Sequence, residues 1–214
     1  MDNSFPLQNS SLVNILTLRY DPLLKPNLPK KTSNDFEINN NIPNTEFIEK
    51  TICENIEKNL KFSNEEKISI ALSGGVDSTL ALSLVRKVKP NIEIEAISIK
   101  FADSVDETIA ASKIAHKFNV NHSIIYLENY LSELPKAISM IKLPFWDLHW
   151  YYVVKKAKTF SNILISGDGG DELFSGYTFR YEKFLSITSK NSTPLEKVKA
   201  YLECHERDRV PDQE

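Results

Sequence analysis

Residues 71–82 read ALSGGVDSTLAL and join two different patterns. Before them, KISIALS at 67–73 predicts a short apolar strand, and after them STLALSLVRKV at 78–88 predicts a helix that stops before Pro90. An ordinary turn needs fewer special residues than two glycines, two serines and an aspartate. Backbone N–H groups that follow a strand and open a helix form a nest for anions. The stretch therefore predicts a phosphate-binding loop.

The residues of this loop suit that purpose. Gly74 and Gly75 let the backbone approach a phosphate with no Cβ in the way, and Ser73 and Ser78 add hydroxyl donors. Asp77 would repel a bare polyphosphate, so its carboxylate predicts a Mg²⁺ ion that bridges to the anion. The lysine of the GxxxxGK[ST] loop does not follow these glycines. A plain turn with a capped helix is the alternative, but the order of strand, SGGVDS and helix favours phosphate binding.

A second glycine-rich loop, SGDGGDELFSGY, occupies residues 166–177. The chain has six glycines and all of them lie in these two loops, so glycine does not serve here as general turn filler. Asp168, Asp171 and Glu172 form a carboxylate cluster suited to a second Mg²⁺ contact or to orienting an amine. An acidic first turn that caps a helix is the alternative. It accounts for Asp171 and Glu172 but leaves the glycine spacing unexplained.

Strand and helix patterns alternate along most of the chain. The expected strands lie at 67–73, 92–99, 122–127 and 162–166, and the expected helices at 44–60, 78–88, 106–118 and 130–160, the last broken at Pro144. This alternation predicts an α/β fold with a doubly wound parallel sheet of strand order 3-2-1-4. Strands one and four are then neighbours, so the loops at 73–78 and 166–172 should face each other across one crevice.

Composition narrows the class of protein. A net charge of −3 over 214 residues offers no basic field, so neither nucleic acid nor a membrane surface is an expected partner. Cys53 and Cys204 lack the spacing of a metal or redox motif, and no stretch approaches the length of a membrane span. We therefore expect a cytoplasmic protein. Residues 1–44 are expected to form an irregular N-terminal arm and residues 45–214 a single domain.

Histidines and aromatic residues give weaker signals. His116, His122, His149 and His205 are scattered without metal-type spacing, and His122 is the one that could approach the crevice. The segment PFWDLHWYY at 144–152 is rich enough in aromatic residues to suggest base stacking, but its helical spacing favours core packing.

The two glycine-rich motifs together resemble a known family. LSGGVDS is similar to the phosphate loop of the ATP-pyrophosphatase superfamily, which has an adenine nucleotide alpha hydrolase-like (HUP-type) fold. The pair LSGGVDS and SGDGGDELFSGY resembles the synthetase domain of asparagine synthetases, from about Thr45 to the end of the chain. The resemblance implies an enzyme that adenylates the side-chain carboxylate of aspartate with ATP, releases pyrophosphate, and then lets ammonia displace AMP to give asparagine.

The resemblance also implies roles for single residues. Asp77 and Asp171 would hold Mg²⁺, and Asp168, where many members have glutamate, would orient groups or transfer a proton beside Asp171 and Glu172. The residues implied to bind ATP through its pyrophosphate and adenosine are Ala71, Leu72, Ser73, Gly74, Gly75, Asp77, Ser78, Ile99, Ser166 and Gly167.

The sequence departs from the family pattern at both ends. About 65 residues before the first strand are too few for a glutaminase domain, so ammonia is expected to be free or to come from a separate glutaminase subunit. No residue matches the C-terminal lysine that the family uses for phosphate. Three alternatives stay open: a nucleotide-binding remnant or regulatory subunit, a transfer-RNA-modifying adenylating enzyme, and a relative that activates another acid, such as a β-lactam-forming enzyme.

Overall fold

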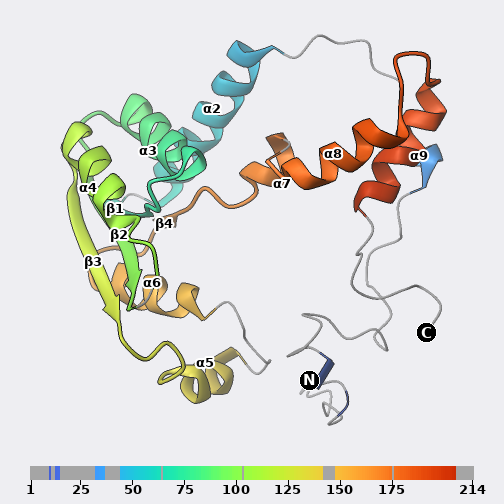
Figure 1. Cartoon of the computed structure of the whole chain (residues 1–214). Coiled ribbons are helices and arrows are strands. Elements are labelled where there is room, and N and C mark those ends of the chain that lie inside the picture. Colours follow the sequence, from blue (N-terminus) through green and yellow to red (C-terminus); the bar gives the residue numbers. More distant parts are fainter. Residues whose placement is uncertain are drawn as a thin grey trace, which may run out of the picture. The chain divides into compact units, whose positions relative to one another are not determined.

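The structure is a computed structural model that describes Ser10 and residues 13–14, 32–36, 44–63, 65–102, 104–141, 148–174 and 176–205. The chain forms two compact units. One comprises Pro43–Gly169, and the other comprises Met1–Ile42 together with Gly170–Glu214. Figure 1 shows the elements of both units in chain order.

A four-stranded parallel sheet forms the centre of the larger unit. Its strands are β1 (Lys67–Ala71), β2 (Glu93–Phe101), β3 (Asn121–Leu127) and β4 (Leu164–Ile165). They lie in the order β3-β2-β1-β4, and each neighbouring pair is parallel. The predicted order 3-2-1-4 is therefore confirmed. Strand β4 is short because it pairs with β1 only at Ser69↔Leu164 and Ile70↔Ile165.

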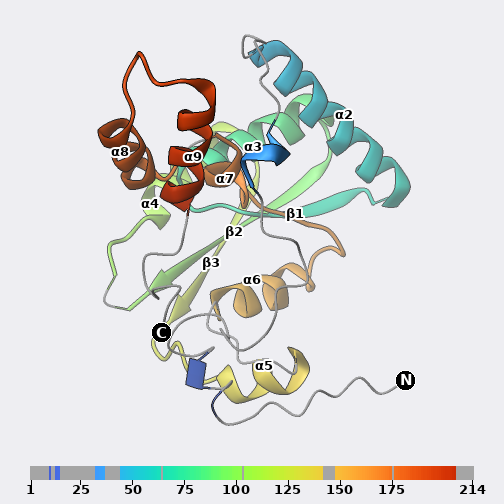
Figure 2. The ribbon, with the colours of Figure 1, turned by 90° about the vertical axis from the view of Figure 1, so that its right-hand side faces the viewer.

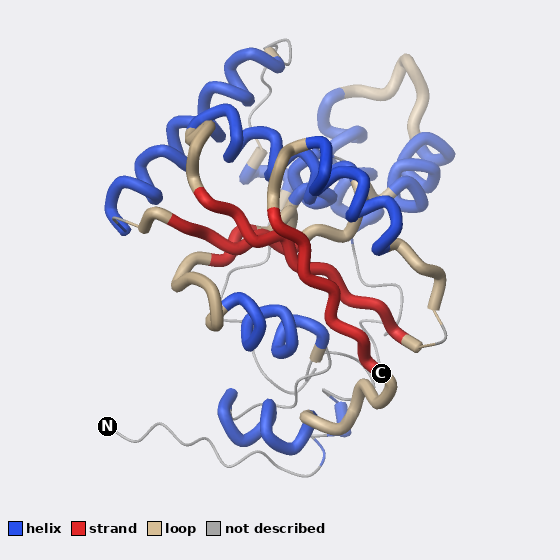
Figure 3. Tube along the Cα trace, turned by 90° about the vertical axis from the view of Figure 1, so that its left-hand side faces the viewer, coloured by secondary structure: helices blue, strands red, loops and turns tan. Residues whose placement is uncertain are grey.

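Helices cover both faces of the sheet, as Figures 2 and 3 show. Helices α2 (Thr45–Ser63), α3 (Val76–Val88) and α4 (Thr108–Lys117) lie on one side. Helix α6 (His149–Ala157) covers the other side, with α5 (Leu134–Ile141) beyond it. The predicted doubly wound α/β fold is confirmed. The predicted break at Pro144 lies outside the described residues.

Two separate cores follow from the alternation of side chains along the strands. Ile68 and Ile70 of β1, with Leu72 just after it, point towards α3 and pack with the fully buried Leu82 and Val85. On the opposite face, Ile97 of β2 packs with Val153 and Ala157 of α6. Both faces of the sheet are thus apolar, which is the usual condition of a parallel sheet.

The two flanking helices show what local pattern did and did not reveal. The start of α2 is capped, because the Asn44 side chain accepts a hydrogen bond from Phe47 N at 3.1 Å. In α4, the helical spacing of Ile109, Ile114 and Phe118 would place all three on one apolar face, but Ile109 is 59 % exposed. Thr108, Ala111 and Ala115 form the buried face instead. Small side chains there let α4 approach the sheet and the loop that follows β1.

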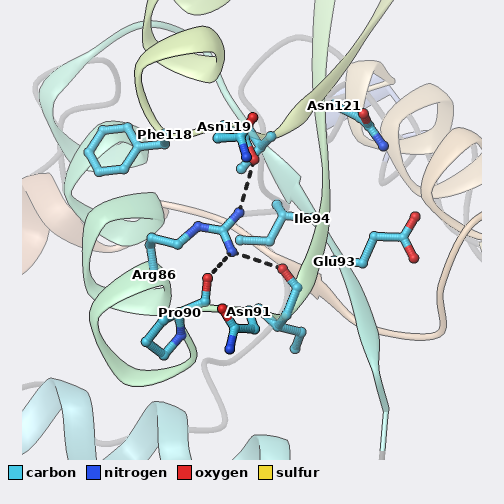
Figure 4. A pocket seen from close by; sticks show the side chains of 10 residues that line it. Arg86, Pro90, Asn91, Glu93, Ile94, Phe118, Asn119 and Asn121 are labelled. Carbon is cyan, nitrogen blue, oxygen red and sulfur yellow. Dashed lines mark hydrogen bonds between the residues drawn. The ribbon is translucent and has the colours of Figure 1, made fainter.

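Arg86 of α3 fastens the edge of the sheet where β2 and β3 begin (Figure 4). Its guanidinium donates to Pro90 O at 2.7 Å, to Ile92 O at 2.9 Å and to Asn119 O at 3.4 Å. Burial lowers the pKa of Arg86, and its Nε has no hydrogen-bond partner within the described part of the chain. A hollow of about 490 Å³ surrounds this clamp. It lies at the amino ends of the strands, opposite to the glycine-rich loops, and is not part of the candidate site.

The smaller unit contains η1 (Ser33–Asp35), α7 (Gly170–Phe174), α8 (Thr178–Ile187) and α9 (Pro194–His205). Helices α8 and α9 pack side by side. Thr32 and Asp35 form a capping box around η1, and the ring of Phe36 meets that of Tyr201 in α9 at 6.0 Å. Most of the predicted irregular arm lies outside the described residues.

Replacing Leu82 by alanine tests the core beneath the loop that follows β1. Leu82 is fully buried, so Leu82→Ala should lower the free energy of unfolding by about 2–5 kcal/mol through lost apolar contact and a residual cavity. Leu80 lies on the same helix and is 45 % exposed, so Leu80→Ala should stay within about 0.5 kcal/mol of the wild type. Urea unfolding measures both values, and equal losses would contradict the assigned packing.

Candidate functional site

The first glycine-rich loop leaves the carboxyl end of β1 and enters α3. Gly74 has a φ of +87°, a conformation that other residues rarely adopt. A Cβ at this position would lie 3.1 Å from Ala110 Cβ and 3.1 Å from Ala111 N of α4. The loop is therefore pressed against α4, and glycine is required both for its backbone angle and for this contact.

Hydroxyl groups brace the loop from inside. Ser78 Oγ donates its single proton to Gly75 O at 3.2 Å. In the 3.1 Å hydrogen bond between the two serine hydroxyls, Ser73 Oγ is therefore the donor and Ser78 Oγ the acceptor. Ser78 Oγ also accepts from Ser73 N at 3.2 Å, and Thr79 Oγ1 donates to Gly75 O at 2.7 Å. Both serine protons that were expected to reach a phosphate are thus used within the loop. The first N–H groups of α3, which lack intrahelical acceptors, are the better donors for an anion.

The second glycine-rich loop begins beside the first, after β4. A Cβ on Gly167 would lie only 2.7 Å from Ser78 N and 2.8 Å from the carbonyl carbon of Asp77. Ser166 Oγ accepts a hydrogen bond from Asp168 N at 3.4 Å, and the Asp168 side chain is exposed. Residues 166–168 and the first loop therefore meet at the carboxyl edge of the sheet, as the strand order predicted.

The residues expected to border an adenosine separate into two groups. Ala71 and Ile99 are partly buried on the α6 face of the sheet, where both pack against the core around Ile97. Leu72 is 1 % exposed, and its side chain belongs to the opposite core with α3. Leu72 is therefore enclosed by the protein, whereas the partly buried Ala71 and Ile99 can offer apolar side chains.

The carboxylates of α7 belong to the smaller unit and have specific partners there. Tyr177 donates its hydroxyl proton to Glu172 Oε1 at 2.5 Å, and the Arg180 guanidinium lies 4.5 Å from the centre of the Tyr177 ring. The hydrogen bond from Tyr177 is the largest of the effects that lower the pKa of Glu172, and the same bond raises the pKa of Tyr177. A Cβ on Gly176 would lie 1.6 Å from Asp171 Oδ1, so this glycine makes room for the carboxylate.

Sequence reasoning missed Tyr177 and Arg180. The signal that was available is the tyrosine that closes the second glycine-rich motif five residues after Glu172, followed by an arginine on the next turn. Glu172 is thus held by neighbours within its own loop, whereas Asp168 lies exposed in the larger unit.

Asp77 is the carboxylate beside the first loop that could bind Mg²⁺. No group of three or more His, Cys, Asp or Glu side chains suited to a metal occurs among the described residues. Mg²⁺ at phosphate sites needs only one or two carboxylates, because phosphate oxygens and water complete its shell. Asp77, the second residue of α3 and close to the glycine pair, fits that mode.

Among the helices that the structure describes, none combines the length and the hydropathy of a membrane-spanning segment.

These features define an α/β fold of the HUP type, with glycine-rich loops after its first and fourth strands. The chain belongs to the asparagine synthase family, since the family model of that description matches residues 57–211. The glutamine-hydrolyzing asparagine synthetase 1 of Bacillus subtilis is 30 % identical over 152 residues, which is 67 % of this chain and 22 % of that protein. A putative glutamine-hydrolyzing asparagine synthetase 2 of Methanocaldococcus jannaschii is 31 % identical over 123 residues, 55 % of this chain and 24 % of that protein.

The chain thus spans about a quarter or less of the length of these relatives. Among solved structures, the NH3-dependent NAD synthetase from Campylobacter jejuni is 20 % identical, with a TM-score of 0.46 over 64 % of this chain and 62 % of that one. At this score the fold assignment depends on the sheet topology and not on the likeness.

Replacing Gly167 tests the contact between the two loops. Gly167→Ala should destabilise the protein by about 1–3 kcal/mol, because the added methyl group meets backbone atoms that cannot yield without moving the loop. Gly75→Ala is the matched control, since its nearest neighbour, Ser73 Oγ at 3.3 Å, is a side-chain atom that can turn aside. Denaturant unfolding should show the larger loss for Gly167→Ala. The reverse order would contradict the close approach of the loops.

Removing the Tyr177 hydroxyl tests the clasp around Glu172. In Tyr177→Phe the pKa of Glu172 should rise towards the ordinary value for glutamate, because the hydrogen bond to the ionised form is lost. Tyr181→Phe, on the same helix, should leave that pKa unchanged. Carboxyl carbon chemical shifts followed by NMR from pH 2 to 7, a range of about five units around the ordinary value, report both. If the pKa of Glu172 is the same in Tyr177→Phe as in the wild type, the hydrogen bond from Tyr177 does not stabilise the ionised carboxylate.

Proposed function

We propose that this chain acts as an ATP-dependent, amide-forming ligase of the asparagine synthetase type. In the proposed reaction, a side-chain carboxylate oxygen of aspartate attacks the α-phosphorus of ATP, and the bond to the bridging oxygen breaks to release pyrophosphate. Ammonia then attacks the carbonyl carbon of β-aspartyl-AMP. AMP leaves, one proton is removed from the nitrogen, and asparagine is formed.

One observation carries this proposal: the close backbone contact of the second loop with the start of α3. Gly167 packs on Asp77 and Ser78, so two glycine-rich segments line one edge where the N-terminus of α3 opens. A leaving pyrophosphate accumulates negative charge, and helix N–H groups fixed in advance stabilise charge at such a position. Membership of the asparagine synthase family supports the same reaction.

Each part of the edge has a proposed role. The N–H groups at the start of α3 hold the phosphates, and the serine brace between Ser73 and Ser78 keeps the loop in the shape that this requires. Ala71 and Ile99 offer apolar contact to adenine on the α6 face. Asp77 would hold Mg²⁺, and the ion would supply positive charge to the phosphates.

Asp168 is the proposed base. Its carboxylate is exposed beside the loop contact, where it can orient ammonia and accept the proton that the nitrogen loses. Glu172 is engaged by Tyr177, so we assign it to holding its loop in shape and not to proton transfer.

The nitrogen donor is part of the proposal. The two asparagine synthetases described above are glutamine-hydrolyzing, and this chain spans 22 % and 24 % of their lengths. We propose that ammonia reaches the site either free or from a separate glutaminase subunit. We further propose a cytoplasmic location, because Cys53 and Cys204, both within the described residues, form no disulfide.

The test is exchange of labelled pyrophosphate into ATP, which requires the adenylation step alone. We expect exchange that depends on aspartate, and asparagine formation when ammonium is added. Asp168→Asn should lower asparagine formation by about 10²- to 10⁴-fold, the usual contribution of a general base. Glu46→Gln, an exposed acid on α2, is the control and should change nothing.

Other outcomes identify the alternatives. ATP binding without exchange, under any supply of ammonia, would point to a nucleotide-binding remnant or regulatory subunit. Exchange that requires transfer RNA, or an acid other than aspartate, would replace the proposed substrate. Either result contradicts the asparagine-forming reaction.

A further inference from the structure

A histidine of β3 is linked by hydrogen bonds, through Ser98, to Leu72, the residue before the phosphate loop. His122 of β3 is partly buried, with its Nε2 2.7 Å from Ser98 Oγ of β2 and its Nδ1 3.0 Å from Ser112 Oγ of α4. Ser98, itself 5 % exposed, donates to Leu72 O at 2.5 Å. The imidazole thus connects α4 with the end of β1 through one intervening hydroxyl.

The donor and acceptor in each of these hydrogen bonds follow from the number of protons that each group carries. The single hydroxyl proton of Ser98 is used on Leu72 O, so Ser98 Oγ can only accept from the ring, and Nε2 of His122 must carry a proton. Nδ1 of the neutral ring then accepts from the hydroxyl of Ser112. Burial lowers the pKa of His122 and outweighs the opposing effect of Glu95 on β2, which favours the neutral ring that this arrangement uses.

This series of hydrogen bonds ends at Leu72 on one side and at Ser112 on the other, and both residues lie next to the phosphate loop or its support. Leu72 is the residue before Ser73, and its own N–H donates to Ile97 O at 2.9 Å, so β2 grips this residue from both its amide and its carbonyl. Ser112 lies on α4 one residue after Ala111, whose N–H would meet a Cβ on Gly74. Gly74 lies between the end of β1 and α4, so the distance between these two elements determines whether the loop fits there.

We propose that His122 is a positioning residue for ATP: through Ser98 and Ser112 it sets where the SGGVDS loop stands between β1 and α4. The proposal rests on the function proposed above and concerns only the nucleotide half of the reaction. His122 touches neither ATP nor aspartate in this role. It acts through the carbonyl of Leu72 and through the face of α4 that supports Gly74.

The test measures ATP affinity directly, by calorimetry with MgATP, at a temperature where thermal unfolding shows every variant folded. His122→Ala and Ser98→Ala should each weaken ATP binding about three- to tenfold, which corresponds to the loss of one net hydrogen bond. His122→Gln places an amide N–H near the position of Nε2 and should restore affinity to within about twofold of wild type. In turnover assays, KM for ATP should rise while KM for aspartate stays constant.

Ser123→Ala is the matched control. Ser123 follows His122 on β3, points to the opposite face of the sheet and bonds the side chain of Glu95. Ser123→Ala should lower the free energy of unfolding but leave ATP affinity unchanged. If His122 had a purely structural role, His122→Ala would give this same result. Equal ATP affinities for wild type, His122→Ala and Ser98→Ala would therefore overturn the positioning role and leave the proposed function standing. A wild-type protein that binds no ATP would overturn both.

Discussion

The candidate site depends on a single close approach of two backbones, that of Gly167 to Asp77 and Ser78. Strands β1 and β4 are paired through only two residues each, and this pairing ends at Ile70↔Ile165, whereas β1 continues along β2 to Ala71. At that point the absence of a side chain at residue 167 lets the second loop lie directly against the first turn of α3. The N-terminal end of α3 and the exposed carboxylate of Asp168 are brought to one edge as a result.

The polar groups around this edge differ in function although they look alike in the sequence. Ser73 and Ser78 resemble two phosphate donors, yet Ser73 Oγ donates to Ser78 Oγ, and Ser78 Oγ donates to Gly75 O. Asp168 and Glu172 resemble two equivalent carboxylates, and both are exposed, yet Glu172 accepts a short hydrogen bond from Tyr177. The first loop is therefore held in its conformation by its own internal hydrogen bonds.

Much of this could be predicted from the sequence because the information is local. Apolar runs predicted the strands, and glycine pairs marked the loops that follow two of them. The alternation of strands and helices then predicted the strand order that the structure confirms. What could not be predicted depends on register between distant segments. Ile109 fits a helical apolar stripe, but the sheet accepts the small side chains of Ala111 and Ala115 instead. Ser98, Ser112 and His122 come together only when β2, β3 and α4 are aligned, and no local pattern encodes that alignment.

The clamp made by Arg86 restricts how this protein can vary in length. One guanidinium holds carbonyl groups of two separate connections, the turn from α3 to β2 and the turn from α4 to β3. Inserting or deleting a residue in either turn would move a carbonyl by roughly one residue spacing, about 3.8 Å, beyond the reach of a planar group already bound elsewhere. Homologous chains that keep this arginine should therefore differ in length at other connections and conserve the size of these two.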